Sequence, residues 1–107
     1  MNIVLSDFFE KKVKHLRKKY PSIGKDILAL IESLESNPLQ GVPLRKGAFK
    51  IRMKISSKGK GKSGGARVIT LLKIEKGVLF LLDIYDKSER ESISDQELDY
   101  LINEIDE

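Results

Sequence analysis

Two segments near the start of the chain space their apolar residues as one buried face of an α-helix requires. This pattern predicts one helix over residues 7–19 and a second over roughly 23–36. Ser6–Asp7 and Ser22 are the expected N-caps, and a proline follows each helix. The apolar stripes are Phe9, Val13 and Leu16 in the first helix and Ile27, Leu30, Ile31 and Leu34 in the second. Because the connection between them is short, we expect an antiparallel pair.

Farther along the chain the period changes to that of β-strands. Residues 48–55 alternate between apolar and basic side chains, so one face should enter a core while the other carries cations. Apolar runs predict three further strands over residues 2–5, 66–74 and 78–85. The last of these is apolar on both faces, which is typical of a central strand covered by layers on either side. Before it, Gly77 is expected to supply the positive φ of a hairpin turn.

The last helix carries the strongest local signals. Ser94 and Glu97 have the spacing of a capping box, and Ile93 and Leu98 that of a hydrophobic staple. Residues 38–47, with two prolines and two glycines, are expected to form a loop. The order β-α-α-β-β-β-α predicts an α+β fold: a small, mainly antiparallel sheet of about four strands, two N-terminal helices packed on one face, and a C-terminal helix. At 107 residues, positions 1–107 should form a single domain.

Charge is distributed unevenly along this chain of net charge +4. Residues 88–107 contain eight acidic residues and one basic residue, whereas Arg45 to Arg67 contain nine basic residues and no acidic one. Such segregation is typical of a protein that binds a polyanion. The absence of cysteine and the single histidine argue against disulfides and structural zinc. No apolar run reaches the ~20 residues of a membrane helix, and no signal peptide is recognisable, so we expect a cytoplasmic protein.

The basic strand and the loop after it form the candidate binding surface. Lys50, Arg52 and Lys54 occupy the polar face of the strand. The following loop, SSKGKGKSGG, adds glycine-flanked amides and cations that suit phosphate groups. The contacts expected there are Lys58, Lys60, Lys62 and Ser63. A nucleotide-binding P-loop is excluded, because Ser56 stands where that motif needs its first glycine and a strand follows instead of a helix. We therefore expect RNA as the ligand.

Some of these residues also suit cleavage of RNA by its own 2′-hydroxyl. His15 is expected on the surface of the first helix, so lysine, arginine, tyrosine or a carboxylate must supply the chemistry. Lys54, surrounded by other cations, should lose its proton more readily and is a candidate base. Arg67 offers a planar fork for two phosphate oxygens. Tyr85 either stacks on a base, passes a proton or caps its strand, and Lys87 is a further candidate phosphate contact.

The run KIRMKISSKGKGKSGGARVIT, the earlier KKYPS and the later LLDIYDKSE resemble the RelE/HigB toxins of bacterial type II toxin–antitoxin systems, in the RelE/ParE superfamily. The resemblance spans nearly the whole chain. It implies a microbial-ribonuclease-like fold and cleavage of messenger RNA, usually in the A site of the 70S ribosome, with no metal or other cofactor. The implied product carries a 2′,3′-cyclic or 3′-phosphate. The implied partner is a cognate antitoxin that covers the active face or displaces the C-terminal helix.

Matched by position, the family's basic row corresponds to Lys50, Arg52 and Lys54, its phosphate-binding arginine to Arg67 and its late-strand tyrosine to Tyr85. We expect Arg52, Lys54, Arg67 and Tyr85 to be catalytic. A second arginine late in the sheet has no clear counterpart, and which lysine is the base stays open. Two other hypotheses remain: a ParE-like toxin that poisons DNA gyrase without nuclease activity, and an RNA-binding domain without catalysis. The basic row favours the nuclease, because a gyrase poison does not need it.

Overall fold

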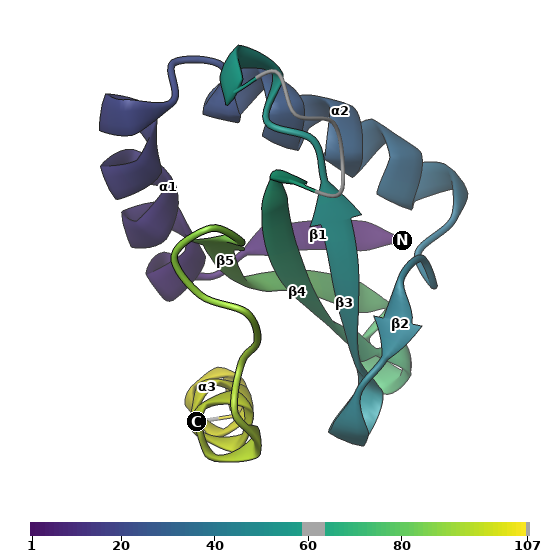
Figure 1. Cartoon of the computed structure of the whole chain (residues 1–107). Helices are drawn as coiled ribbons and strands as arrows, with labels where there is room; N and C mark the ends of the chain where they lie inside the picture. Colours follow the sequence, from purple (N-terminus) through teal and green to yellow (C-terminus); the bar gives the residue numbers. More distant parts are fainter. Residues whose placement is uncertain (59–63, 107) are drawn as a thin grey trace.

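The computed structural model describes residues 1–58 and 64–106, and Figure 1 shows the path of the chain. The described residues form a five-stranded sheet in the order β1-β5-β4-β3-β2, together with three helices. The strands are β1 (Asn2–Leu5), β2 (Val42–Pro43), β3 (Ala48–Met53), β4 (Ala66–Lys73) and β5 (Val78–Asp86). The helices are α1 (Asp7–Lys19), α2 (Ile23–Ser36) and α3 (Asp95–Asp106). The α+β class expected from the sequence is confirmed.

The sheet has one strand more than expected, and it is mixed. Strand β2 lies inside the segment 38–47 that was predicted to be a loop, where Val42 and Pro43 pair with β3. Two residues are too few to show a period, and proline is tolerated because β2 is an edge strand. Strand β1 runs parallel to β5 along its whole length, whereas the other pairs are antiparallel. At the β4–β5 turn Gly77 has φ of 63°, as expected.

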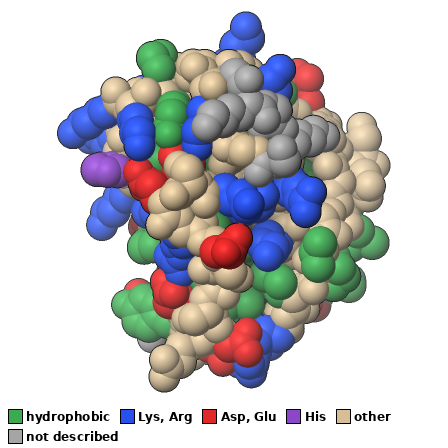
Figure 2. Space-filling view, viewed as in Figure 1, with side chains coloured by type: hydrophobic (Ala, Val, Ile, Leu, Met, Phe, Trp, Pro, Cys, Tyr) green, Lys and Arg blue, Asp and Glu red, His purple; other side chains and the backbone are tan. Residues whose placement is uncertain are grey.

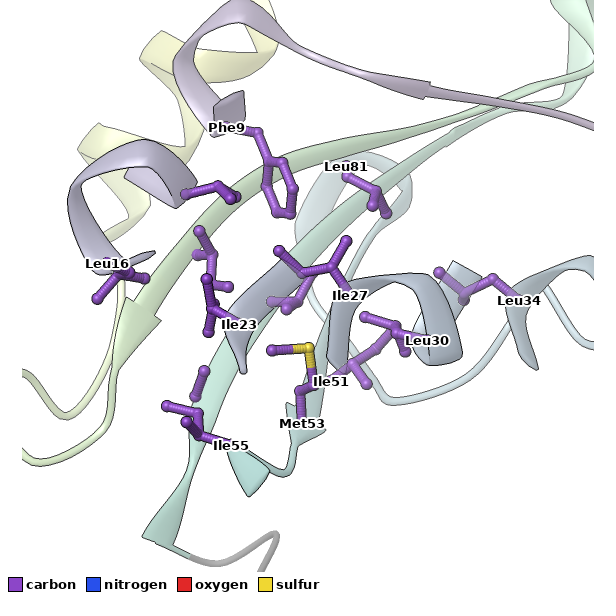
Figure 3. Close-up of a cluster of buried hydrophobic side chains, with 14 of the residues drawn as sticks. Phe9, Leu16, Ile23, Ile27, Leu30, Leu34, Ile51, Met53, Ile55 and Leu81 are labelled. Atoms are coloured by element: carbon purple, nitrogen blue, oxygen red, sulfur yellow. The ribbon is translucent and has the colours of Figure 1, made fainter. Parts of the chain in front are cut away.

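Separate apolar clusters cover the two faces of the sheet. Helices α1 and α2 pack on one face, as predicted, and Figure 3 shows their side chains meeting those of the strands. Members of this cluster include Phe9, Ile23, Ile27, Leu30, Ile51, Met53, Ile55 and Leu81. Helix α3 packs on the opposite face and is set apart from the other two helices in Figure 1. Its buried residues Leu98, Leu101 and Ile102 belong to a cluster with Ile69, Leu71 and Leu82 of the sheet.

Ion pairs supplement the packing of α3. Arg45 lies 3.2 Å from Asp95, and Lys73 lies 3.0 Å from Asp106. These pairs bring the acidic C-terminal helix against basic residues that flank β3 and end β4. The helix covers the part of its face where β4 is apolar, and it leaves Arg52 on β3 exposed.

Two of the three predicted helix caps are confirmed. The Ser6 hydroxyl accepts a hydrogen bond from the first turn of α1, and the Ser94 hydroxyl accepts one of 3.1 Å from the backbone N–H of Glu97. The expected cap at Ser22 is wrong: its backbone is helical, and its hydroxyl instead donates to Asp26 at 2.8 Å. Among the described residues, no helix combines the length and apolar character needed to cross a membrane.

Candidate functional site

Three of the expected catalytic residues are direct neighbours across the sheet. Arg52 on β3 is paired in register with Arg67 on β4, and Arg67 is paired with Tyr85 on β5. Residues opposite each other on neighbouring strands have Cβ atoms about 5 Å apart and share a face. The residues next to them in sequence, Ile51 and Val68, point to the helical pair, so the row lies on the opposite face. We call Arg52, Arg67 and Tyr85 the central row.

Members of the central row differ in exposure. Arg52 is exposed, whereas Arg67 and Tyr85 retain only 5% and 4% of their accessible surface. One nitrogen of the Arg67 guanidinium donates to the carbonyl oxygen of Ala66 at 3.2 Å. This bond helps to fix the position of the Arg67 side chain beside the backbone of its own strand.

The Tyr85 hydroxyl is buried and makes no hydrogen bond within the part of the chain that the structure describes. Burial raises the pKa of Tyr85, although the positive charges of Arg90 and Arg67 act in the opposite direction. The hydroxyl therefore keeps its proton at neutral pH. The hydroxyl is a protonated donor, and a ligand oxygen can reach it only if the side chains that cover it move.

Arg90 joins this site from outside the sheet. Its guanidinium carbon lies 5.1 Å from the centre of the Tyr85 ring, within the range of a cation–π contact. The same guanidinium donates to the Glu97 carboxylate at 2.5 Å, in the first turn of α3, and to the carbonyl oxygen of Ser92 at 3.1 Å. Sequence reasoning did not include Arg90 in the site, because Arg90 lies beyond the last strand, in a segment without a regular spacing of apolar residues. Its one sequence signal is that it is the sole basic residue of the acidic region 88–107.

The polar face of β3 carries the expected cations. Arg52 and Lys54 are exposed and Lys50 is half-buried, and none of the three forms a salt bridge within the described residues. Figure 2 shows basic side chains gathered near the centre of the face it presents. Arg52 and Lys54 also line a pocket of about 290 Å³ beside α2, which Asp26 borders from the other side. We call Lys50, Arg52 and Lys54 the basic row.

Lys58, which is expected to contact RNA, forms hydrogen bonds within the protein. Its ammonium group lies 2.7 Å from the Asp86 carboxylate and 3.2 Å from the Ser88 hydroxyl. The hydrogen bond to Asp86 raises the pKa of Lys58. Lys87 is half-buried, with its ammonium 4.0 Å from Glu91. The other expected loop contacts, Lys60, Lys62 and Ser63, lie outside the described residues.

Three consecutive residues after β3, Ser56 to Lys58, are bonded to α2, to the residue that precedes α2 and to β5. The backbone N–H and the hydroxyl of Ser56 donate to Asp26 of α2, at 2.9 and 2.5 Å. The backbone N–H of Ser57 donates to the Ser22 hydroxyl at 2.8 Å, and Lys58 binds Asp86 at the end of β5. These bonds hold the segment that begins two residues after Lys54.

The two carboxylates in these bonds have lowered pKa values. Burial by itself would raise the pKa of Asp26, but hydrogen bonds from Ser56 and Ser22 and the charge of Lys54 outweigh it. For Asp86, burial is likewise outweighed, by bonds from Lys58, Tyr20 and Ser88 that lower its pKa. Both groups are therefore ionised at neutral pH and hold the chain around the site.

The site offers cations and a protonated phenol. Among the described residues, no three His, Cys, Asp or Glu side chains lie close enough together to hold a metal ion. His15 is exposed on α1, as expected. Arg52 and Arg67 can hold a phosphate, and Tyr85 can donate to one of its oxygens.

Comparisons with known proteins agree with this architecture. The chain matches the family model described as the RelE toxin of the RelE/RelB toxin–antitoxin system over residues 8–104, a span that includes the central row. A comparison with curated protein sequences gives no match. Among solved structures, the isolated Escherichia coli RelE toxin is similar to this chain, with a TM-score of 0.50 and 16% identity over 97% of both chains. That likeness concerns the fold, whereas the family model covers most of the sequence. The chain belongs to the RelE family of toxins from toxin–antitoxin systems.

Proposed function

We propose that this toxin is an endoribonuclease that cleaves messenger RNA in the ribosomal A site and thereby inhibits translation in the cytoplasm. The observation that supports the proposal is the central row, in which Arg52, Arg67 and Tyr85 are adjacent across three strands. Family membership supports the toxin role. The central row adds the groups that phosphodiester cleavage needs, because cations can hold the charge that develops on phosphorus and a phenol can supply a proton.

In the proposed reaction the RNA's 2′-oxygen forms a bond to phosphorus while the bond to the 5′-oxygen breaks. Lys54 accepts the proton of the 2′-hydroxyl. Arg67 binds two oxygens of the phosphate and Arg52 adds a second positive charge. Tyr85 donates its proton to the departing 5′-oxygen, and the product carries a 2′,3′-cyclic phosphate. Every role is filled by a side chain, so the proposed reaction uses no metal ion.

The proposed partners are messenger RNA, the 70S ribosome and a cognate antitoxin. The basic row carries no salt bridge in the described structure, and an acidic antitoxin segment is its natural protein ligand. Binding of that segment should weaken as salt is raised, because exposed charges are screened over about 8–10 Å at physiological ionic strength.

Induced expression in a bacterial host tests the function. Expression should arrest growth. Primer extension on abundant transcripts should then show new 5′ ends confined to translated regions. The variant Arg52→Gln should abolish both effects. The control variant Lys25→Gln, which changes an exposed lysine on α2, should retain them. Growth arrest with intact transcripts and relaxed DNA would contradict the proposal and indicate a ParE-like gyrase poison. RNA binding without new 5′ ends would indicate a domain that binds and does not cut.

A further inference from the structure

The pocket beside α2 is adjacent to the central row, and the proposed reaction places no part of the RNA in it. Its volume is about 290 Å³. Arg52 and Lys54, at the end of β3, line one side, and Asp26 and Ala29 of α2 line the other. We call this space the edge pocket. Because Arg52 belongs both to the central row and to the wall of the edge pocket, a ligand at one can reach the other.

The edge pocket exists because the pairing of β2 with β3 stops early. Val42 is paired with Lys50, so a longer β2 would place Gln40 opposite Arg52. Gly41 turns the chain away at this point with φ of 97°, and a Cβ atom there would lie 2.4 Å from the Lys50 carbonyl oxygen. The space of one residue pair is thereby left open beside β3.

This open edge presents the backbone groups of Arg52. In an antiparallel strand, every second residue directs its N–H and C=O groups to the same neighbouring strand. The Ala48 carbonyl accepts a hydrogen bond from Leu44 on the β2 side, so Arg52, four residues later, directs both groups to that side. Neither group is hydrogen-bonded to Gln40 or to another loop residue in the described part of the chain. A donor and an acceptor therefore lie side by side, which suits the hydrogen-bonding edge of an unpaired nucleobase.

The walls of the edge pocket carry opposite charges. Lys54 contributes a cation, and the pKa of Asp26 is lowered, so its carboxylate is ionised. A phosphate is attracted by Lys54 but repelled by Asp26, and should therefore stay at the basic row. Leu30, Ile51 and Met53, which lie together in Figure 3, give the pocket an apolar side that suits a neutral ring.

Most of the groups that remain for a ligand are hydrogen-bond acceptors. The amide nitrogen of Gln40 donates to the Ser33 hydroxyl at 2.7 Å and to the Asn37 carbonyl oxygen at 3.1 Å, which leaves the amide oxygen of Gln40 for a ligand. The Arg52 carbonyl and the Asp26 carboxylate are further acceptors. Adenine and cytosine can donate to them from an amino group, whereas uracil has a carbonyl oxygen where cytosine has its amino group.

We infer that the edge pocket binds a nucleobase of the substrate RNA next to the scissile phosphate, and that it favours a base with an amino group. The inference rests on the proposed function, in which Arg52 contacts that phosphate. A strand of a protein partner fits less well, because the open edge is one residue long. Strand β2 closes it at one end, and the hydrogen bonds from Ser56 to Asp26 close it at the other.

The test uses short RNAs that differ only in the bases on the two sides of the cut. A 2′-deoxy nucleotide at the cut position prevents cleavage during binding measurements. Replacing one of these two bases by an abasic site should weaken binding to the wild-type protein about tenfold, the scale of one stacked base. At the same position, uracil in place of cytosine should weaken binding about fivefold, because the amino donor is lost.

The variant Ala29→Phe fills the edge pocket from α2, where residue 29 is exposed. It should bind the intact RNA about tenfold more weakly than wild type and the abasic RNA equally well. The control Leu28→Phe adds the same ring at the neighbouring exposed position, which does not line the pocket, and should bind both RNAs as wild type does. Unchanged thermal unfolding of both variants would show that the fold is intact.

The inference is overturned if the wild-type protein binds intact and abasic RNAs equally, whichever base is removed, or binds neither. It is also overturned if Ala29→Phe weakens binding of both RNAs equally or of neither, or if Leu28→Phe loses as much. Weaker antitoxin binding by Ala29→Phe with unchanged RNA binding would assign the pocket to a protein partner and overturn it too.

Failure of the proposed function looks different from failure of this inference. If the proposed function fails, induced expression of the wild-type toxin leaves transcripts intact. If only the inference fails, the new 5′ ends appear, and they show the same base preference in wild type and in Ala29→Phe.

Discussion

Asp86 and Lys58 form a buried ion pair of 2.7 Å that joins the end of β5 to the segment after β3. The Asp86 side chain is fully buried, and that of Lys58 is 12% exposed. Tyr20 and Ser88 also donate to the same carboxylate. Asp86 directly follows Tyr85, and Lys58 lies in the segment after β3. The ion pair therefore helps to set the position of the central row relative to that segment.

Replacing Asp86 by Asn should destabilise the protein strongly. The change leaves the Lys58 ammonium group partly buried without a counter-charge, and removing one partner of a buried pair costs about 3–5 kcal/mol. Urea unfolding at pH 7 measures this loss of unfolding free energy. The control Lys87→Gln breaks an exposed pair and should change stability by less than about 1 kcal/mol. A loss below about 1 kcal/mol for Asp86→Asn would show that the pair does not hold these segments together.

Stability should fall in acid because the pKa of Asp86 is lowered from its ordinary value of 3.8. A carboxylate whose folded-state pKa is depressed contributes stability above its unfolded-state pKa, and that contribution is lost as pH falls through the folded-state value. The unfolding free energy should therefore decline as pH drops below about 4. The decline should be smaller in Asp86→Asn. Equal slopes for the two proteins would assign the acid sensitivity to other carboxylates.

Replacing Arg67 by Lys should separate cleavage from binding. The positive charge remains, but the fork that binds two phosphate oxygens is lost. Single-turnover cleavage should fall by about 10²–10³-fold, as when one transition-state donor is removed, while RNA affinity changes about threefold or less. Arg17→Lys, at an exposed position on α1, is the control and should cleave normally. Cleavage at the wild-type rate in Arg67→Lys would refute the assigned role.

Replacing Tyr85 by Phe should slow cleavage without reducing stability. The Tyr85 hydroxyl is buried and makes no hydrogen bond in the described structure, so its removal takes away a desolvated polar group and no partner. If the hydroxyl supplies the proton for the 5′-oxygen, cleavage should fall about 10²-fold or more. The midpoint of thermal unfolding should stay the same or rise. An unchanged cleavage rate would leave Tyr85 a packing or stacking residue.

Replacing Arg90 by Gln should raise the pKa of Tyr85 further. Burial is the main cause of the raised value, and the charge of Arg90 counteracts it. Spectrophotometric titration of the variant, with Tyr85→Phe in the same background to identify the Tyr85 signal, measures the shift. Glu91→Gln, an exposed neighbour of the same segment, should leave the titration unchanged. A lower or equal pKa in Arg90→Gln would mean that the contact between guanidinium and ring does not persist in solution.

Local sequence patterns predicted much of the fold. The bounds expected for α1 and α2, residues 7–19 and 23–36, are those of the structure. The capping box of Ser94 and Glu97 is confirmed by a hydrogen bond. Periods and caps depend on residues only a few positions apart, so they are visible in a single sequence.

The expectations that failed involve partners distant in the chain or side chains with a choice of partner. Ser22 was expected to cap α2, but its hydroxyl donates to Asp26. The same carboxylate accepts a hydrogen bond from Ser56, in the segment after β3. The bond between Lys58 and Asp86, 28 positions away, was not predicted. Contact of Lys58 with RNA remains a prediction.

The sequence by itself determined the helices, every strand except β2, and the alternation of β3. It also marked Arg52, Arg67 and Tyr85 as candidates. Each of these depends on side-chain identity and short-range geometry. Only the tertiary structure decided that these three residues are neighbours and that Arg90 lies over the Tyr85 ring. Strand register and loop placement result from packing of the whole chain, in which burial of many apolar residues outweighs any one local preference. Short-range patterns in the sequence therefore identified Arg52, Arg67 and Tyr85 as candidates, but long-range contacts between strands bring them together.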